Sequence, residues 1–379
     1  MHLKPILIGM FTLMKANRMN PTQIELYSEQ FAEFEKPLVS SGSLSAGLFR
    51  FPSGVCAVRL RNERGELVLL PYQGQQIWSA KMAGRDLTMK SMFDQPYPTR
   101  ELLATFGAFM VHCGVTGVGS PGPTDSHPLH GELPNAPYQT AQIILGEDEH
   151  GTFIGLTGTY HHILAFNFNY IAQPLVKLYA GSTVFHLSMT ITNHKQTPMP
   201  LLYLAHINFK PVDHGRLVYS APCDPAHMRV RASVPDFMVM PPGYREFLAE
   251  LKENPARHLK LEPGLAFNPE VVFYIDYLAD AGGWAHELQL HPDGSADVVR
   301  HRLDQLDHGV RWICRIPEQD ALGFEPATSE VEGFTAEQKK GNVRSLGAGQ
   351  SFHCDIELGL LSAAEAVREL ALIDQILAG

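Results

Sequence analysis

Three short segments of the sequence carry side chains suited to proton transfer. The first, SPGPTDSHPLHGELPNAPY at residues 120–138, holds His130 between a leucine and a glycine. The second, LLYLAHINFKP at residues 201–211, contains His206, and the third, GFEPATSEVEGF, contains Glu325. A histidine exchanges its proton near neutral pH, and burial can raise the pKa of a glutamate toward the same range. Such groups could serve as the general acid and the general base of one reaction.

The proline-rich loop is a candidate ligand-binding segment. Its prolines remove backbone hydrogen-bond donors, which excludes a helix, and they restrict the backbone. Gly131 would let the backbone approach a ligand closely, with His130 projecting beside it. The competing interpretation is a solvent-exposed histidine without a function. The loop also carries Asp125, His127 and Glu132, which a simple spacer does not need.

The segment at residues 201–210 reads as a strand whose two faces differ. Alternation puts five side chains on one face, namely Leu202, Leu204, His206, Asn208 and Lys210. This face changes from apolar to polar along its length. The change predicts the floor of a cleft, and the alternative is a sheet edge that meets solvent.

Glu325 precedes a proline, so its backbone is restricted to an extended conformation. A partly buried glutamate there could be a general base, and the alternative is an exposed carboxylate in a turn. Glu330 and Glu332 lie near enough in the sequence to compete for the assignment. His161 and His162 are weaker candidates as metal ligands, because neighbours on a strand point to opposite faces.

The remainder of the chain must position these groups, and its pattern is typical of an all-β protein. Hairpins are expected around residues 146–151 and around the pair Asp293-Gly294. Residues 182–193 alternate strictly between apolar and polar side chains. The sequence shows no regular succession of strand, helix and strand, which argues against a Rossmann domain. We therefore predict a large antiparallel sandwich followed by a short C-terminal helix.

We expect one continuous domain at residues 41–362. A partly helical or irregular lead-in at residues 1–40 would precede it, and a helix at residues 363–379 would pack on it. The first 20 residues include an apolar stretch without a signal-peptide cleavage site, and Met19 could be the native start. These features favour a cytoplasmic protein.

Composition narrows the classes of function. The formal net charge of −10 and the lack of a basic run argue against nucleic-acid binding. The five cysteines are scattered singly, so neither a disulfide framework nor a zinc–thiolate site is expected, and a reducing cytosol fits this usage. The sequence predicts no membrane span.

The order of these motifs resembles the aldose 1-epimerase, or galactose mutarotase-like, superfamily, and more narrowly its uncharacterised DUF4432 branch. The likeness lies within residues 42–361 and is carried by HCGVTGVGSPGPTDSHPLHGELPNAPY, LLYLAHINFKP, GFEPATSEVEGF and LGAGQSFHCDIELGLL. The resemblance implies an antiparallel β-supersandwich with a sugar-binding cleft. In this family a histidine protonates the ring oxygen of a pyranose while a glutamate takes the proton of the anomeric hydroxyl. The ring opens and closes again as the other anomer.

The resemblance also assigns roles to residues of this chain. It implies that His206 is the acid, that Glu325 is the base and that His130 binds the substrate. Further partners of the sugar hydroxyls are expected to be Asn208, Arg85 and Asn135. The reaction requires no metal and no other cofactor, and the expected partner is a small-molecule sugar. The sequence does not predict the oligomeric state.

Two positions depart from the family pattern. Gln350 stands where many members have the catalytic glutamate, and Glu132 follows His-Gly where the DUF4432 branch tends to have an arginine. Glutamine cannot act as a base, so a non-catalytic carbohydrate-binding or regulatory protein is the main alternative. A carboxylate at position 132 would disfavour acidic sugars. A hydrolase or lyase would need a second carboxylate near Glu325, and a metal held by His130 and His206 would indicate a metal-dependent isomerase.

Overall fold

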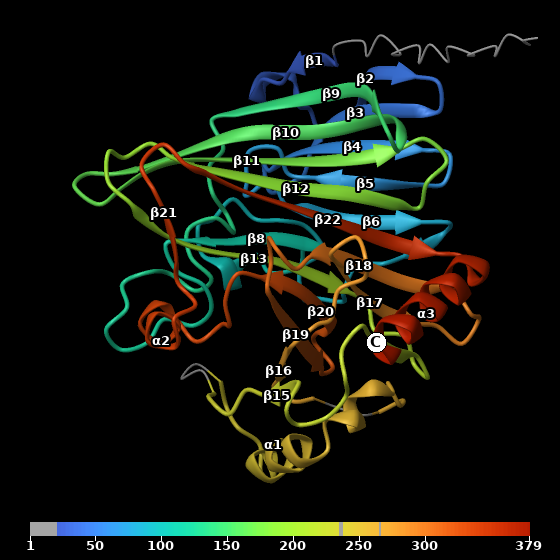
Figure 1. The fold of residues 1–379 in the computed structure, drawn as a ribbon. Coiled ribbons are helices and arrows are strands. Elements are labelled where there is room, and N and C mark those ends of the chain that lie inside the picture. The colour runs from blue at the N-terminus through green and yellow to red at the C-terminus, as the bar shows by residue number, and fades with distance from the viewer. Residues whose placement is uncertain (1–20, 235–237, 265–266) are drawn as a thin grey trace, which may run out of the picture.

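A computed structural model describes residues 21–234, 238–264 and 267–379. Its main elements are two large antiparallel sheets that lie one behind the other (Figure 1). The predicted large antiparallel all-β sandwich is therefore confirmed. The expectations about the start of the chain concern residues 1–20, which lie outside the described residues.

The sheet in front in Figure 1 has nine strands. Their spatial order is β1 (Thr22–Glu25), β9 (Thr140–Asp148), β10 (Gly151–Leu164), β11 (Phe168–Tyr179), β12 (Val184–Asn193), β22 (Ser351–Leu361), β18 (Ala296–Arg302), β17 (Trp284–Leu290) and β14 (Arg216–Tyr219). The predicted hairpins are those of β9 with β10 and of β17 with β18.

The second sheet has 13 strands. Along its main path the order is β15 (Met228–Val230), β16 (Val271–Ile275), β19 (His308–Arg315), β20 (Asp320–Ala327), β13 (Met199–Phe209), β8 (Met110–Val115), β6 (Ile77–Met82), β5 (Gly65–Leu69), β4 (Cys56–Asn62), β3 (Leu44–Arg50) and β2 (Lys36–Ser41). Two short strands complete it, β21 (Arg344–Leu346) beside β13 and β7 (Arg85–Asp86) beside β6.

The described part of the expected lead-in belongs to the sandwich itself. Strand β1 pairs with β9 in the nine-stranded sheet, and β2 pairs with β3 in the other sheet. Its helical portion is a single 3-10 turn, η1 (Ser28–Gln30). The pairing of β1 joins residues more than 100 positions apart, so local sequence gives no sign of it.

The core lies between the sheets, and the alternation of each strand decides what enters it. On β12, Phe185, Leu187 and Ile191 are buried in the main hydrophobic cluster, as their spacing predicts. On β13, the odd-numbered residues such as Tyr203 join the same cluster. The even-numbered residues of β13 face away from the other sheet, where Leu202 belongs to a second cluster. Strand β13 is therefore buried on both faces.

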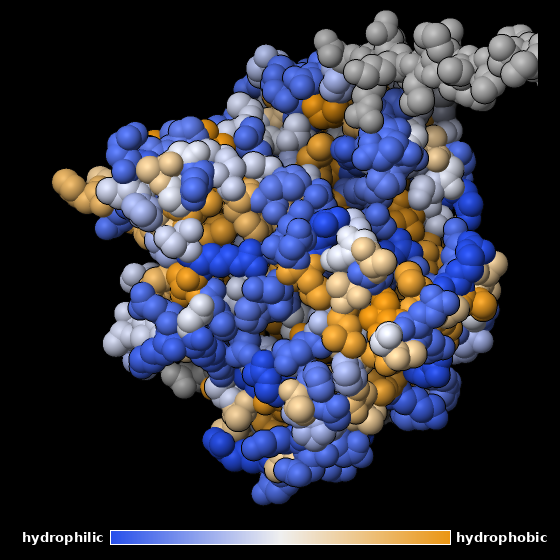
Figure 2. All heavy atoms as spheres, viewed as in Figure 1, coloured by the Kyte–Doolittle hydropathy of each residue, from blue (hydrophilic) through white to orange (hydrophobic). Residues whose placement is uncertain are grey.

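Few helices accompany the sheets. They are α1 (Tyr244–Glu253), α2 (Phe334–Lys340), α3 (Ala363–Ala378) and the 3-10 turns η2 (Leu102–Ala104) and η3 (Pro255–Leu259). The predicted C-terminal helix is α3, which begins at a capping box formed by Ser362 and Glu365. Figure 2 shows hydrophobic residues beside this helix on a largely hydrophilic face. Among the described helices, none combines the length and the apolar composition needed to cross a bilayer.

Candidate functional site

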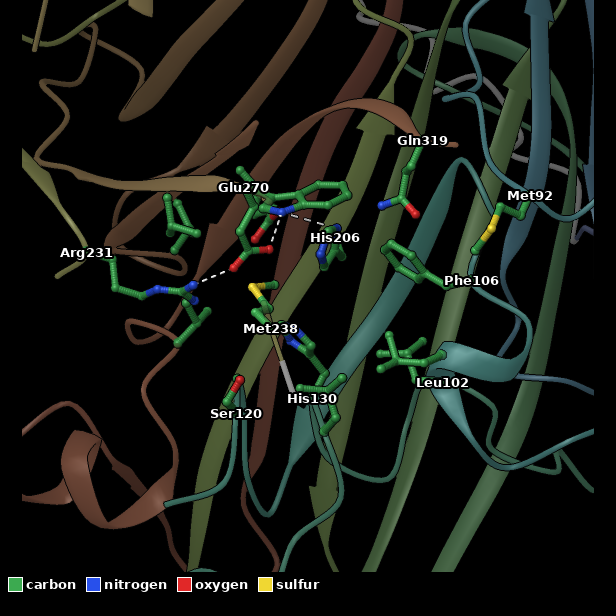
Figure 3. Close-up of a pocket in the computed structure, with 18 of the residues that line it drawn as sticks. Met92, Leu102, Phe106, Ser120, His130, His206, Arg231, Met238, Glu270 and Gln319 are labelled. Atoms are coloured by element: carbon green, nitrogen blue, oxygen red, sulfur yellow. Dashed lines mark hydrogen bonds and ion pairs between the residues drawn. The ribbon is translucent and has the colours of Figure 1, made fainter. Parts of the chain in front are cut away.

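A pocket of about 320 Å³ opens on the face of the 13-stranded sheet that points away from the nine-stranded sheet. Strands β13, β20 and β19 supply its floor, and residues from two loops, 92–106 and 119–130, form much of its wall. Figure 3 shows side chains from these separate segments pointing into one cavity. Its volume falls in the range of about 300–1,000 Å³ that is usual for small-molecule sites.

His206 and Glu325 meet on the floor because their strands are neighbours. The antiparallel register that pairs Ile207 with Phe324 places His206 opposite Glu325. The Nδ1 atom of His206 lies 3.4 Å from Oε1 of Glu325, and the two side chains are only 6% and 2% exposed. Both atoms are buried, and neither has a hydrogen-bond partner among the described residues. Both residues line the pocket, and each keeps one buried polar atom without a described hydrogen-bond partner.

Gly323 leaves the space that the Glu325 carboxylate occupies. Both residues lie on the same face of β20, two positions apart. A Cβ atom at Gly323 would come within 2.3 Å of Oε1 of Glu325. A side chain at this position would displace the carboxylate, so the glycine fixes where Glu325 can point.

Burial disfavours the charged forms of both members of the pair. It lowers the pKa of His206 to about 4, an effect that Asn208 opposes only in part. It raises the pKa of Glu325 well above its usual value, although the Arg311 guanidinium acts in the opposite direction. Burial therefore favours the arrangement in which Glu325 holds the single proton of the pair and His206 is neutral.

His130 enters the same pocket from the proline-rich loop. Its ring centroid lies 5.4 Å from that of His206, and its Nδ1 atom is buried without a described hydrogen-bond partner. The residue adopts a φ of +59°, and Gly131 follows with a φ of +80°. A Cβ atom at Gly131 would lie 2.3 Å from the carbonyl oxygen of Gly117, so only glycine fits here. Burial also lowers the pKa of His130 well below its usual value.

The other polar residues of this loop anchor it. Asp125 accepts a hydrogen bond from the backbone of Thr335 at 3.0 Å, and Nε2 of His127 accepts one from the backbone of Phe334 at 3.2 Å. Both contacts tie the loop to the start of α2. The loop thus holds His130 in place through Asp125 and His127, and these two residues have structural roles.

Aromatic rings flank the His206 imidazole. The ring centroids of Phe106 and Trp312 each lie 5.5 Å from that of His206. The Trp312 indole N–H donates to Glu270 at 2.6 Å, and the other oxygen of Glu270 accepts from Arg231. Both carboxylate oxygens of Glu270 are therefore engaged, which suits it to hold Trp312 rather than to exchange protons.

Glu270 and Arg231 were missed by the sequence analysis, although both line the pocket. The available signal was a lone charged residue directly before the strongly apolar strand β16. Their pairing joins residues separated by 39 positions along the chain. Neither residue belongs to a motif, so only the folded chain shows that they act together.

The three other predicted sugar-binding residues lie outside the pocket lining. Asn208 is fully buried and donates to the carbonyl of Ala108 at 3.0 Å. Arg85 pairs with Asp293 at 2.6 Å, at the turn between β17 and β18. Asn135 is buried and accepts hydrogen bonds from two glutamines through its Oδ1 atom. Each of these side chains thus bonds to protein groups outside the pocket, although Oδ1 of Asn208 and Nδ2 of Asn135 lack a described partner.

The two residues that depart from the family pattern, Glu132 and Gln350, also lie outside the pocket lining. Glu132 is buried and accepts hydrogen bonds from Thr116 Oγ1 at 2.7 Å and Tyr170 Oη at 2.5 Å. These partners engage its carboxylate, and Glu132 does not line the pocket that holds His130 and His206. Gln350 accepts from the backbone of Gly347 at 2.9 Å in an exposed turn before β22. It does not line the pocket, so its lack of acid–base chemistry says nothing about this site.

Potential metal ligands gather at one other place. Within the three described ranges, one group of three carboxylates is close enough to hold an ion, formed by Glu330, Glu332 and Glu337. The ammonium group of Lys340 donates to all three at 2.5–2.9 Å. The adjacent histidines bind neighbours instead: Nε2 of His161 contacts Asn169, and Nδ1 of His162 contacts Tyr160.

Comparison with known sequences gives one match. Residues 52–224 match the model of a family described as a domain of unknown function, DUF4432. The matched span includes His130 and His206, whereas Glu325 lies beyond it. None of the curated proteins matches the chain.

Solved structures with the same fold cover nearly the whole chain. A protein from Klebsiella pneumoniae subsp. pneumoniae, provisionally named an aldose 1-epimerase, is 18% identical with a TM-score of 0.77, and the match covers 94% of this chain and 96% of that one. The Slr1438 protein of Synechocystis is 14% identical with a TM-score of 0.58, covering 80% and 95%. A galactose mutarotase-related enzyme of Lactobacillus acidophilus is 12% identical with a TM-score of 0.54, covering 81% and 98%. The structures show that this chain shares the galactose mutarotase-like fold, and the match over residues 52–224 agrees with the expected resemblance to DUF4432.

Proposed function

We propose that this chain, which matches DUF4432 and has the galactose mutarotase-like fold, interconverts the anomers of a free aldose by acid–base ring opening. One observation carries the proposal. His206 and Glu325 present atoms 3.4 Å apart that are buried and face the pocket without described partners. Two proton-exchanging groups side by side in a small-molecule pocket are what this reaction needs.

The reaction exchanges two protons and leaves no net change. One member of the pair takes the proton of the anomeric hydroxyl while the other gives a proton to the ring oxygen. The bond from the anomeric carbon to the ring oxygen breaks, and the carbonyl of the open-chain aldose forms. Rotation about the bond between C1 and C2 presents the other face of the carbonyl. Closure then reverses both proton transfers and yields the other anomer.

A pair that carries a single proton can run this cycle in both directions. In the arrangement favoured by burial, protonated Glu325 gives its proton to the ring oxygen and neutral His206 accepts the hydroxyl proton. Ring opening leaves His206 protonated and Glu325 ionised. That second arrangement is the one the family resemblance implies, with His206 as acid and Glu325 as base. Each turnover therefore uses both arrangements.

His130 is suited to bind a substrate hydroxyl. Its Nδ1 atom is buried and unpartnered among the described residues, and its ring contacts His206 edge-on. A neutral imidazole offers one donor and one acceptor, which matches a hydroxyl group. We assign it to orienting the ring of the sugar against the His206–Glu325 pair.

The proposal is tested by the rate of anomer exchange in purified protein, measured by NMR with a panel of aldoses where spontaneous exchange is slow. We expect acceleration by the wild type and a loss of about 10²- to 10⁴-fold in kcat for His206→Ala and Glu325→Gln, because each removes one proton-transfer group. His130→Ala should mainly raise KM. His194→Ala changes an exposed histidine and is the matched control.

Two outcomes would contradict the proposal. If the wild type binds sugars without accelerating exchange, the protein is a carbohydrate-binding protein rather than an isomerase. If exchange is accelerated but neither His206→Ala nor Glu325→Gln reduces it, the reaction occurs at another site.

A further inference from the structure

The polar and apolar parts of the pocket are separated. Among the residues that line the pocket, those with a buried polar atom and no described hydrogen-bond partner for it are His130, His206 and Glu325, which cluster together. Most of the other lining residues are apolar, and they include Phe106, Val272, Val310 and Trp312. Such a wall is unusual around a ligand that carries a hydroxyl on nearly every carbon, since each buried hydroxyl needs a partner.

The immediate neighbours of the acid–base pair are almost all apolar. Phe106 and Trp312 flank His206, with ring centroids at 5.5 Å, and Val310 is the cross-strand partner of Glu325. The only polar hydrogen on the Trp312 ring is already donated to Glu270. Two polar side chains beside the pair have a buried atom without a described hydrogen-bond partner, His130 through Nδ1 and Asn208 through Oδ1. Of these two, only His130 lines the pocket.

Two further polar side chains without a charge line the pocket. Ser120 and Gln319 both line the cavity, and Figure 3 shows them at opposite sides of it. They can serve hydroxyls on the more distant ring carbons. Arg231 and Glu270 neutralise each other, so the described part of the wall offers no unpaired cation for a phosphate or a carboxylate.

The geometry of a pyranose makes this corner selective. Carbon 5 is bonded directly to the ring oxygen, and it carries the exocyclic carbon 6. The group that exchanges a proton with the ring oxygen must therefore lie close to carbon 6. If His206 contacts the ring oxygen, carbon 6 lies near Phe106 and Trp312. If Glu325 contacts the ring oxygen, carbon 6 lies near Val310 and Trp312. A hydroxyl on carbon 6 would be buried there without a partner, whereas a methyl group would be buried favourably.

Resting on the proposed function, we infer that the substrate is a 6-deoxyhexose, an aldose with a methyl group in place of the usual hydroxymethyl group. The hydroxyls on the other ring carbons face His130, Ser120 and Gln319. The methyl group lies against the aromatic rings beside the pair. An apolar pocket rejects an added hydroxyl only moderately, so the preference is expected to be about 10- to 100-fold in kcat/KM.

The experiment compares sugars that differ at carbon 6 alone. Anomer exchange is measured by NMR for D-fucose against D-galactose and for 6-deoxy-D-glucose against D-glucose. We expect the deoxy sugar to have the higher kcat/KM in the pair with the accepted ring stereochemistry. Equal values or a preference for the parent hexoses would overturn the inference and leave the proposed function intact.

A pair of variants tests the location of the preference. Phe106→Tyr adds a hydroxyl beside His206, and we expect it to reduce the ratio between deoxy and parent sugar several-fold. Phe93→Tyr makes the same change at another pocket phenylalanine, which contacts Tyr97, and it should retain the wild-type ratio. A ratio unchanged in Phe106→Tyr would place the methyl group elsewhere and overturn the assignment.

Binding provides a readout that does not depend on catalysis. Ligand-observed NMR competition between the same sugar pairs reports their relative affinity for the wild type. If no sugar shows accelerated exchange, the proposed function fails, and tighter binding of the deoxy sugar would still support this substrate class. Equal or weaker binding of the deoxy sugar would overturn it.

Discussion

At the scale of single residues, the site gathers groups that the fold keeps uncharged. His130, His206 and Glu325 are enclosed by the sheet, the proline-rich loop and aromatic side chains, so burial disfavours the ionised form of each. This arrangement suits proton exchange with a neutral sugar. It also costs stability, because Glu325 must hold a proton that it would release in the unfolded chain.

Glu325→Gln is therefore expected to stabilise the protein while it abolishes activity. The folded pKa of Glu325 lies above its unfolded value of 4.5, so folding stability is lost as the pH rises beyond 4.5 toward the folded pKa. Each unit of elevation corresponds to about 1.4 kcal/mol. The variant carries no such penalty, so its advantage in free energy of unfolding should grow as the pH rises from 4.5 toward the folded pKa of Glu325.

Urea unfolding at a series of pH values measures this difference. Glu246→Gln, which removes an exposed carboxylate from α1, is the control and should follow the wild type. If Glu325→Gln proves less stable than the wild type at pH 8, the carboxylate is ionised in the folded protein, and the proposed single-proton pair is wrong.

At the scale of elements, the C-terminal helix is held on the sandwich by a buried carboxylate. Glu369 on α3 accepts from Nδ1 of His286 at 2.7 Å and from Nε of Arg300 at 2.6 Å. These partners stand on β17 and β18. Although burial opposes ionisation, the hydrogen bonds from His286 and Arg300 lower the pKa of Glu369 to about 2. Apolar packing by Ile373 completes the attachment.

Glu369→Gln should detach this helix in part and destabilise the protein by about 1.5–3 kcal/mol, the usual cost of losing a hydrogen bond to a charged group, since Arg300 keeps its ion pair with Glu357. The folded pKa lies below the unfolded one, so the contribution is present above pH 4.5 and lost as the pH falls toward about 2. Amide hydrogen exchange should be faster in α3. Asp374→Asn on the exposed face is the control, and equal exchange in both variants would contradict this role.

At the scale of the whole molecule, one buried cation joins the two sheets behind the site. Arg311 is completely buried and donates to Glu287 of β17 at 2.7 Å and to Tyr219 of β14 at 3.1 Å. It also donates to the carbonyl of Gly323 at 2.8 Å, directly behind the glycine that makes room for Glu325. The link between the sheets and the geometry of the site therefore depend on the same side chain.

Arg311→Met should destabilise the protein by about 3–5 kcal/mol, because Glu287 would remain buried without its partner. The double variant Arg311→Met with Glu287→Leu removes both charges and should regain most of this loss in urea unfolding. A double variant no more stable than the single one would show that packing of the arginine, rather than charge pairing, joins the sheets.

Local pattern was sufficient to predict the architecture and part of the site. Alternation on β12 and β13 reports which side chains enter the core, and this signal is contained within a few consecutive residues. The proline-rich loop, His206 and Glu325 were found in the same way, with the family resemblance linking them. The structure brings His130, His206 and Glu325 into one pocket, as that interpretation required.

The sequence by itself thus determined the all-β fold, the faces of its strands and three residues that line one pocket. Only the tertiary structure decided the partners of the polar groups. It engaged Arg85, Asn135 and Glu132 with other protein groups, and it joined Arg231 to Glu270 across the pocket wall. Alternation is a property of neighbouring residues, whereas a hydrogen bond between distant strands depends on sheet order and register, which arise when the whole chain folds.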